Sequence, residues 1–197
     1  NFTVSVTDGD LTDSQVLTVT IAAVNDTPVA STDLSGETSE GVSITIQLSA
    51  SDVDGDNLTY SLLSDATNGS ITIEGQLATY TPTDYYYGAD EFTFQVSDGE
   101  LTDNASVSLF VNAVNDAPVL AVLDNVSFDE DSSGGVTLSA TDIDGDDLTY
   151  SVTTGTDIVA TLDGSDLSFS APADFNGSEN FTVSVTDGDL TDSKVLT

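Results

Sequence analysis

The stretch Asp142-Ile143-Asp144-Gly145-Asp146-Asp147-Leu148-Thr149-Tyr150 decides how this chain is organised. A near copy, Asp52-Val53-Asp54-Gly55-Asp56-Asn57-Leu58-Thr59-Tyr60, stands 90 residues upstream. In both stretches three aspartates occupy alternate positions, so an extended backbone points their carboxylates to one side. The glycine between them permits a turn. The same acidic loop followed by Leu-Thr-Tyr therefore occurs twice, which indicates an internal repeat.

Other landmarks recur with the same period. Asn25-Asp26-Thr27-Pro28-Val29 returns as Asn115-Asp116-Ala117-Pro118-Val119, and residues 180–197 repeat residues 1–18 at every position but one. The sequence therefore predicts three parts. They are the C-terminal hairpin of a preceding repeat at 1–24, a complete repeat at 25–114, and a second repeat at 115–197 that is truncated in its last strand.

Apolar residues alternate with polar ones through much of each repeat, as in Phe92-Thr93-Phe94-Gln95-Val96 and around Val107, Leu109 and Val111. This alternation is typical of half-buried strands. We expect Val42, Ile44, Ile46 and Leu48 to face the core, and a strand from Val16 to Val24 to complete the first hairpin. In the complete repeat the predicted strands lie near 28–34, 42–50, 58–64, 70–74, 76–81, 91–97 and 105–113. Seven short strands in each repeat predict an all-β fold of tandem seven-strand antiparallel β-sandwiches.

The composition excludes several classes of partner and of site. The formal net charge is −34, with 35 acidic residues and one Lys or Arg, so nucleic acid and anionic membrane surfaces are excluded as partners held by charge. No apolar run approaches the roughly 18 residues of a membrane span, so we expect no direct membrane insertion. Without cysteine, neither a disulfide framework nor a thiolate zinc site can form.

The composition also argues against an enzyme. The chain has no His or Cys and only one basic side chain, which excludes nucleophilic triads. A pair of carboxylates can hydrolyse glycosides, but that chemistry needs a cleft in which one acid has a raised pKa. Several exposed acids in one loop do not meet that description.

The acidic loops instead predict a metal site. Their oxygen ligands, with almost no basic side chain to pair them, favour a hard cation, and Ca²⁺ in particular. An EF-hand is excluded because its twelfth position needs Glu, whereas this chain has Leu63 and Thr153 there. Two alternatives stay open. The first alternative is that the loops are solvated acidic turns without a metal. The second is that the overall acidity adapts the surface to high salt.

The order of the predicted strands places the acidic residues at the two ends of each sandwich. The acidic loop, the turn that holds Asp98 and the entering linker share one end, whereas Asp84 and Asp90 lie with other acids at the opposite end. A hairpin turn is an equally good reading of the Asp-Gly pairs at 98–99 and 187–188. The candidate calcium ligands are Asn25, Asp26, Asp52, Asp54, Asp56 and Asp98 at the start of the first repeat, Glu37 and Glu40 at its other end, and Asn115, Asp116, Asp142, Asp144, Asp146 and Asp187 in the second repeat.

Over its whole length the chain resembles the bacterial cadherin-like, Ig-like repeats that occur in tandem in very large secreted adhesins. The resemblance rests on the Asn-Asp-x-Pro-Val linkers, the Asp-x-Asp-Gly-Asp-x-Leu-Thr-Tyr loops and the closing Phe-x-x-x-Val-x-Asp-Gly. It implies Ca²⁺ held between successive domains, with Asn115 and Asp116 as linker ligands. It also implies Asp142 and Asp144 as ligands from the following repeat and Glu40, then Glu37, from the preceding one. The linker is shorter than in animal cadherins, and the acid–Arg–Glu motif is missing.

These observations lead to a functional hypothesis. We expect calcium-rigidified extender modules of an extracellular or cell-surface adhesin, which mediate adhesion and biofilm formation by spacing a binding domain away from the cell. One alternative is a set of modules that bind a polysaccharide or one another, for which Tyr85-Tyr86-Tyr87 would be an aromatic platform if it does not simply pack. Another is a set of accessory domains of an extracellular hydrolase. The expected partners are adjacent repeats of the same chain and neighbouring copies that contact residues 1–24.

Overall fold

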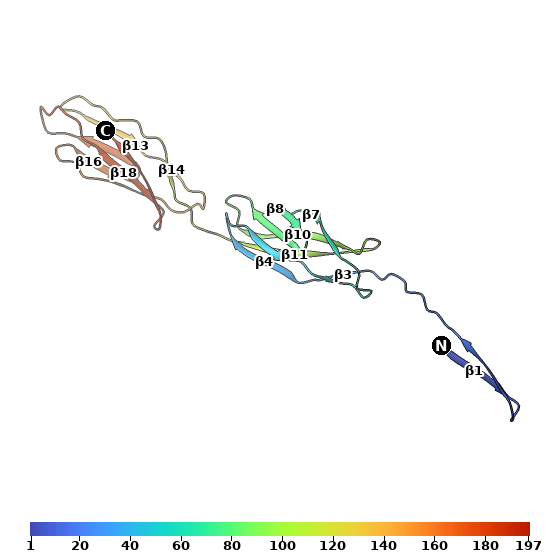
Figure 1. Cartoon of the computed structure of the whole chain (residues 1–197). Helices are drawn as coiled ribbons and strands as arrows, with labels where there is room; N and C mark the ends of the chain where they lie inside the picture. Colours follow the sequence, from blue (N-terminus) through green and yellow to red (C-terminus); the bar gives the residue numbers. More distant parts are fainter. The chain divides into compact units, whose positions relative to one another are not determined.

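A computed structural model describes all 197 residues of the chain, and it contains strands, turns and irregular segments only. No helix is present that is long and apolar enough to cross a membrane. The chain divides into two compact units, residues 1–83 with 88–111 and residues 84–87 with 112–197 (Figure 1). The predicted all-β class and the tandem sandwiches are confirmed.

The first unit contains a β-sandwich made from two sheets and a short strand pair, and the pairs β10–β11, β10–β7, β5–β9 and β8–β9 are antiparallel. One sheet has four strands, in the order β4, β11, β10 and β7, and the other has three, in the order β5, β9 and β8 (Figure 1). The short pair joins β3 to β6. Their bounds are β3 Val29–Ala30, β4 Leu34–Ser39, β5 Ile44–Gln47, β6 Ala50–Ser51, β7 Thr59–Ser64, β8 Gly69–Glu74, β9 Leu77–Pro82, β10 Gly88–Ser97 and β11 Thr102–Asn112.

Two of the predicted strands are each divided between two sheets. The predicted strand at 28–34 becomes β3, which pairs with β6, and β4, which pairs with β11. Asp33 between them has a φ of 63°, a left-handed conformation that ends the extended run. The predicted strand at 42–50 likewise becomes β5 and β6, and Val42 is 54% exposed instead of facing the core. The prediction was wrong here because each segment changes its hydrogen-bonding partner midway.

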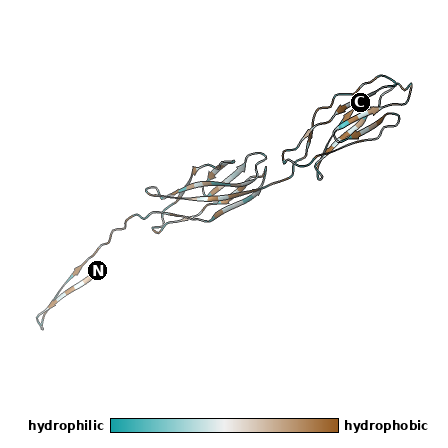
Figure 2. Ribbon diagram, turned by 180° about the vertical axis from the view of Figure 1, so that it is seen from behind, coloured by the Kyte–Doolittle hydropathy of each residue, from teal (hydrophilic) through white to brown (hydrophobic).

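The core of the first unit comes from strict alternation along β10 and β11. Phe92, Phe94 and Val96 of β10 are buried, as are Val107 and Val111 of β11. These positions are the ones that the alternating pattern predicted. Figure 2 shows hydrophobic residues along the strands of both sandwiches.

The second unit repeats this design with a three-stranded sheet in place of the four-stranded one. Its sheets have the orders β13-β17-β16 and β15-β18-β19, and a short pair joins β12 to β14. The rings of Phe169 and Phe181, one from each sheet, lie 5.0 Å apart between their centres and connect the two layers. The bounds are β12 Val119–Leu120, β13 Ser133–Thr137, β14 Ala140–Thr141, β15 Thr149–Val152, β16 Val159–Asp163, β17 Asp166–Ser170, β18 Phe181–Thr186 and β19 Thr191–Leu196.

The N-terminal hairpin consists of β1 (Phe2–Thr7) and β2 (Thr12–Leu17), and every residue of both strands is exposed. Phe2 is paired with Leu17, as Phe181 is with Leu196 in the matching hairpin of the second unit. The predicted strand from Val16 to Val24 was too long, since residues 18–24 form no strand. The pairing of β2 with β1 ends at Leu17.

Candidate metal centre

The acidic loop of each repeat winds around one carboxylate oxygen. In the first repeat Oδ1 of Asp52 accepts the backbone N–H groups of Asp54 at 2.9 Å, Gly55 at 3.0 Å and Asp56 at 3.3 Å. Gly55 has a φ of 81°, which a residue with a side chain rarely adopts, so the glycine permits the turn. The second repeat has the same three bonds, in which Oδ1 of Asp142 accepts from Asp144 at 2.9 Å, Gly145 at 3.1 Å and Asp146 at 3.5 Å.

This loop gathers three carboxylates at one point. Asp52, Asp54 and Asp56 each offer an oxygen within 4.8 Å of the others, and Asp142, Asp144 and Asp146 form the matching cluster in the second repeat.

The second oxygens of the two loop-centring aspartates are buried and have no hydrogen-bond partner. They are Oδ2 of Asp52 and Oδ2 of Asp142. A buried charged oxygen without a partner is costly, and a bound cation removes that cost. An all-oxygen donor set of this kind fits Ca²⁺, which takes carboxylate and carbonyl ligands in flexible geometries.

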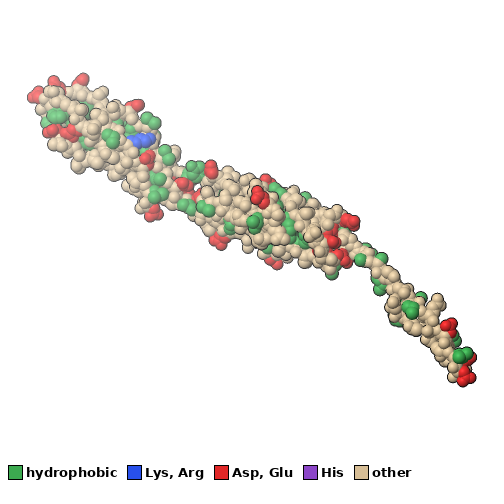
Figure 3. All heavy atoms as spheres, viewed as in Figure 1, with side chains coloured by type: hydrophobic (Ala, Val, Ile, Leu, Met, Phe, Trp, Pro, Cys, Tyr) green, Lys and Arg blue, Asp and Glu red, His purple; other side chains and the backbone are tan.

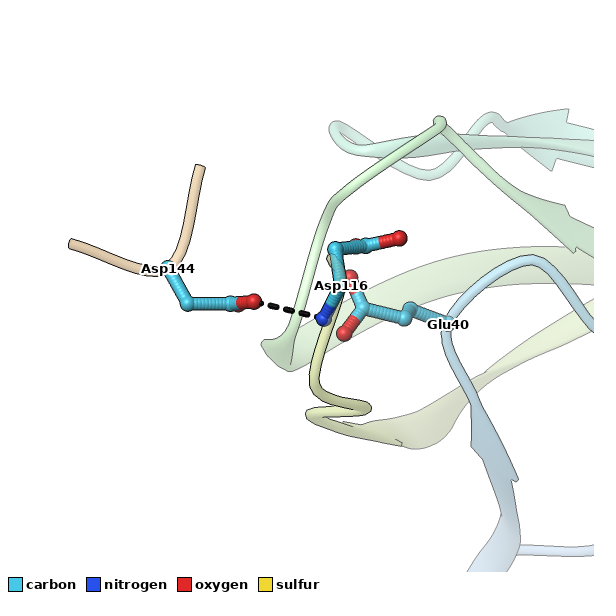
Figure 4. Close-up of side chains that lie close together, drawn as sticks. All are labelled: Glu40, Asp116 and Asp144. Carbon is cyan, nitrogen blue, oxygen red and sulfur yellow. Dashed lines mark hydrogen bonds between the residues drawn. The ribbon is translucent and has the colours of Figure 1, made fainter. Parts of the chain in front are cut away.

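The linker that enters each repeat is hydrogen-bonded to the same loop. The backbone N–H of Asp26 donates to Oδ2 of Asp54 at 2.8 Å, and Nδ2 of Asn25 donates to Oδ2 of Asp98 at 2.9 Å. The second repeat has the same two bonds, from the Asp116 N–H to Asp144 Oδ2 at 2.8 Å (Figure 4) and from Asn115 Nδ2 to Asp187 Oδ2 at 3.0 Å. The structure thus brings together the linker, the acidic loop and the last turn of each repeat.

The Asp-Gly turns have a structural role of their own. Oδ1 of Asp98 accepts the N–H groups of Leu101 and Glu100, both at 2.7 Å, and these bonds, with the smaller effect of Asn25, hold the pKa of Asp98 below its ordinary value. The N–H of Leu190 acts first among the groups that lower the pKa of Asp187 in the same way. The exposed N-terminal hairpin has this turn too, with Leu11 N–H donating to Asp8 at 2.8 Å. The hydrogen bonds of the turn are therefore enough to explain why an aspartate stands at these positions. Calcium ligation by Asp98 and Asp187 stays a prediction.

Negative charge accumulates in the second cluster without side-chain compensation. The pKa of Asp146 is raised, first by loss of solvent around its carboxyl and then by the charges of Asp142, Asp144, Asp187 and Asp147. The chain's one basic side chain, Lys194, donates to the carbonyl oxygen of Leu120. Figure 3 shows this imbalance on one face, where acidic side chains far outnumber the basic one. A cation is therefore the natural counter-charge for the cluster.

The structure places the two predicted glutamate ligands at the end of β4. Glu37 is exposed and lies within the strand, beyond the predicted strand end near residue 34. Glu40 is half-buried in the turn after the strand. Glu37 lies in a strand because the second half of the predicted 28–34 strand shifts its pairing to β11. In that pairing β4 continues to Ser39. The role of both residues in a site shared with the next repeat stays a prediction.

Other carboxylates hold loops in place, and the sequence did not predict this role. Asp90, expected among the exposed acids at the far end, accepts the N–H groups of Thr67 at 3.0 Å and Asn68 at 2.9 Å and the hydroxyl of Tyr80 at 3.0 Å. Asp103 accepts the N–H of Ala30 at 2.8 Å, and Asp192 accepts that of Leu120 at 2.9 Å. The tripeptide Leu-Thr-Asp recurs at 11–13, 101–103 and 190–192. This recurrence in the sequence could have indicated that Asp103 and Asp192 share a role.

Comparison of the sequence with known proteins gives one family and one related enzyme. The family described as Bacterial Ig domain matches residues 25–110 and 115–197. A chitinase A of Pseudoalteromonas piscicida is 33% identical over 116 residues, which are 56% of this chain and 14% of the chitinase. The chain thus spans a small part of that relative.

Solved structures with a similar fold include cadherin domains. The PcdhgB3 EC1-4 structure matches with a TM-score of 0.62 at 14% identity, covering 94% of this chain and 52% of that one. Human protocadherin-24 EC1-2 matches with a TM-score of 0.55 at 19% identity, covering 87% of this chain and 93% of that one. These likenesses concern the fold, which agrees with the resemblance to cadherin-like modules seen in the sequence. With both of its repeats matched, the chain belongs to the bacterial Ig domain family.

Proposed function

We propose that the two repeats are calcium-stiffened extender modules of an extracellular or cell-surface adhesin. The observation that carries this proposal is the buried, unpartnered carboxylate oxygen at the centre of each acidic loop, on Asp52 and on Asp142. A buried charged oxygen without a partner, present in both repeats, supports a bound cation over a solvated turn.

The hydrogen bonds of the loop explain how ion binding would stiffen the chain. When bound, Ca²⁺ supplies the positive charge that lets the three carboxylates of a cluster stay together. Asp142 already holds the loop backbone through Oδ1, and Asp144 accepts the linker N–H of Asp116. Fixing the Asp144 carboxylate would therefore also fix the direction of the linker where it enters the repeat.

Spacing is the role that suits such modules. The repeats are similar to each other along their length, and the hairpins at 1–18 and 180–197 are nearly identical. Repetition of one unit multiplies length without adding a new surface. An extended series of such units would hold a separate binding domain away from the cell.

A second candidate is an accessory module of an extracellular polysaccharide hydrolase, and the chitinase match favours it. Under this proposal the repeats space or orient a catalytic domain, or bind the polymer themselves. Affinity electrophoresis of the 197-residue chain through gels that contain soluble chitin derivatives tests the binding form. Retarded migration would support binding of the polymer by the repeats. Unchanged migration would contradict binding and leave spacing of a catalytic domain as the accessory role.

The proposal is tested by calcium titration calorimetry on matched variants. Asp142→Asn keeps the shape of the side chain but removes the charge, so calcium affinity at that loop should fall by about tenfold or more. Asp147→Asn removes the same charge from the same loop, yet the first repeat has Asn57 at that place, so binding should change little.

Solution scattering with calcium and with chelator tests the mechanical part. We expect the largest dimension of the chain to fall, or to become more widely distributed, when calcium is removed. Absence of binding at millimolar calcium, or equal binding by wild type and Asp142→Asn, would refute the calcium site. Binding without any change in dimensions would refute only the stiffening.

A further inference from the structure

The segment that enters each repeat is bonded to the last hairpin of the same repeat at two points. In the first repeat Nδ2 of Asn25 donates to Oδ2 of Asp98 at 2.9 Å, and the N–H of Ala30 donates to Oδ2 of Asp103 at 2.8 Å. In both bonds the two partners stand 73 positions apart in the sequence. The entering segment therefore runs alongside the hairpin in a single register and in the same direction.

The second repeat has the same two bonds. Nδ2 of Asn115 donates to Oδ2 of Asp187 at 3.0 Å, and the N–H of Leu120 donates to Oδ2 of Asp192 at 2.9 Å. Both of these bonds join residues that are 72 positions apart. The distance of five residues between the two acids comes from the sequence Asp-Gly-x-Leu-Thr-Asp, which both hairpins contain. The register of the entering segment is thus a common feature of the repeats.

Asp103 binds the edge of β3 that faces away from β6. β3 pairs with β6, and beside this pair the N–H of Ser31 donates to the carbonyl oxygen of Ser49 at 3.0 Å. Because neighbouring N–H groups of a strand point to opposite edges, the N–H of Ala30 is directed away from β6. Ala30 is 5% exposed, so without the carboxylate this N–H would be buried and unpaired, which is costly. The side chain of Asp103 therefore fixes where β3 lies along the hairpin.

The stretch between the two bonds is stiff. Pro28 lies between Asn25 and Ala30 and is buried. A proline fixes its own φ and restricts the residue before it to extended conformations. A position that is set at Ala30 is therefore transmitted to Asp26, whose N–H donates to Oδ2 of Asp54 in the acidic loop at 2.8 Å.

We propose that Asp103 and Asp192 are positioning residues for the cation sites at the acidic loops. Each fixes the register of the entering segment along its hairpin and thereby places the Asn-Asp pair of the linker beside the loop. The inference rests on the proposed calcium function and adds to it the residues that place the linker. A residue that orients the ligands of a metal without touching it commonly changes the metal affinity by about tenfold or more.

The first test is calcium titration calorimetry of the full chain that carries Asp142→Asn, so that the loop of the first repeat is measured. Asp103→Ala removes the acceptor, and calcium affinity should fall by about tenfold or more. Asp103→Asn removes the same charge but keeps a carbonyl oxygen that can accept the N–H of Ala30, so affinity should stay close to that without the change. Glu74→Ala is the control, because it removes one exposed carboxylate of β8 in the same repeat.

The second test is amide exchange followed by NMR in chelator, which measures the register without the ion. Asp103→Ala should speed the exchange of Ala30 several-fold, and also that of Asp26, which lies four residues before it. Asp103→Asn should leave the exchange of Asp26 as it is in the wild type. Asp192→Ala should have the same effect on the linker of the second repeat.

Several outcomes would overturn the proposal. Equal loss of calcium affinity in Asp103→Ala and Asp103→Asn would show that the aspartate acts only through its charge. Unchanged affinity and unchanged exchange of Asp26 in Asp103→Ala would show that the bond to β3 does not position the linker. Loss of the folded state in both alanine variants would make Asp103 and Asp192 folding residues instead. Absence of calcium binding by the wild type would refute the calcium function itself, and with it this role.

Discussion

At position 142 the two oxygens of one carboxylate have different surroundings. Its Oδ1 organises the loop by accepting three backbone N–H groups, whereas its Oδ2 is buried without a partner. One oxygen therefore shapes the loop, and under the proposed function the other is available to the cation. The two oxygens of Asp52 differ in the same way, so the arrangement is common to both repeats.

Glu179 provides a pH-dependent contribution to stability that is separate from the acidic loops. Its pKa is held below the ordinary value of 4.5, first by the N–H of Asp157 and then by that of Thr156, at 2.7 and 2.8 Å. Since the folded state lowers this pKa, the stabilisation is complete above pH 4.5 and is lost as the pH falls through the folded value. We expect Glu179→Gln to lower the melting temperature at neutral pH and to approach wild type in acid.

The measurement is thermal melting from neutral to acid pH, with Glu130→Gln as the control because Glu130 is an exposed acid of the same repeat. A Glu179→Gln deficit that stays constant across this range would contradict the assignment.

Gly69 is required for close packing at the start of β8. A Cβ atom there would fall on the ring of Tyr80 and 2.7 Å from the carbonyl oxygen of Thr81, and the latter cannot move without shifting the strand. Gly69→Ala should lower the free energy of unfolding of the first repeat by about 1–3 kcal/mol, as overpacking commonly does. Urea titration against Ser70→Ala, at an exposed neighbouring position, measures the difference. Equal stability of the two variants would show that the strand relaxes freely.

At the scale of elements, two nearly identical hairpins have different surroundings. The strands β1 and β2 have the same register as β18 and β19, so pairing and turn are properties of the local sequence. Phe2 is 64% exposed, whereas its counterpart Phe181 is 3% exposed. Local sequence thus forms the hairpin, and only a second sheet buries it.

This difference predicts unequal stability within one molecule. A two-stranded hairpin without a packed face is marginal in water. We expect backbone amides of β1 and β2 to exchange by local opening within seconds to minutes, whereas those of β18 exchange near the rate of global unfolding. Amide exchange followed by NMR distinguishes the two hairpins, with Gln15 and Lys194 as assignment markers. Equal protection would mean that another surface covers the first hairpin.

At the scale of the whole molecule, the charge of −34 admits two explanations. Specific calcium binding stabilises through occupied sites, by about 2.7 kcal/mol per site at a hundredfold excess over Kd. Adaptation to high salt acts through general screening and requires no particular residue. The two explanations predict different responses to the same ionic strength.

Thermal melting in chelator, with subsequent addition of calcium or of NaCl at matched ionic strength, separates them. We expect calcium to raise the melting temperature more than NaCl does, and we expect Asp52→Asn with Asp142→Asn to remove that excess. If NaCl alone restores full stability, the salt-adaptation hypothesis is the better one.

The sequence by itself determined the repeat, the sandwich class and the position of the acidic loops. Alternation at Phe92, Phe94 and Val96 sets which face is buried, because successive side chains of a strand point to opposite sides. The alternate aspartates around Gly55 and Gly145 set the loop, because the bonds that shape it join residues two to four positions apart. Each of these features depends on neighbours in the sequence, so a sequence pattern reveals it.

Only the tertiary structure decided features that depend on distant partners. The two predicted strands at 28–34 and 42–50 divide because each half pairs with a different strand, and Asp90 serves as an acceptor because the loop at Thr67 folds over it. Pairing between remote segments carries no periodic signal in one sequence, since its free energy depends on which backbone edge each segment meets after folding.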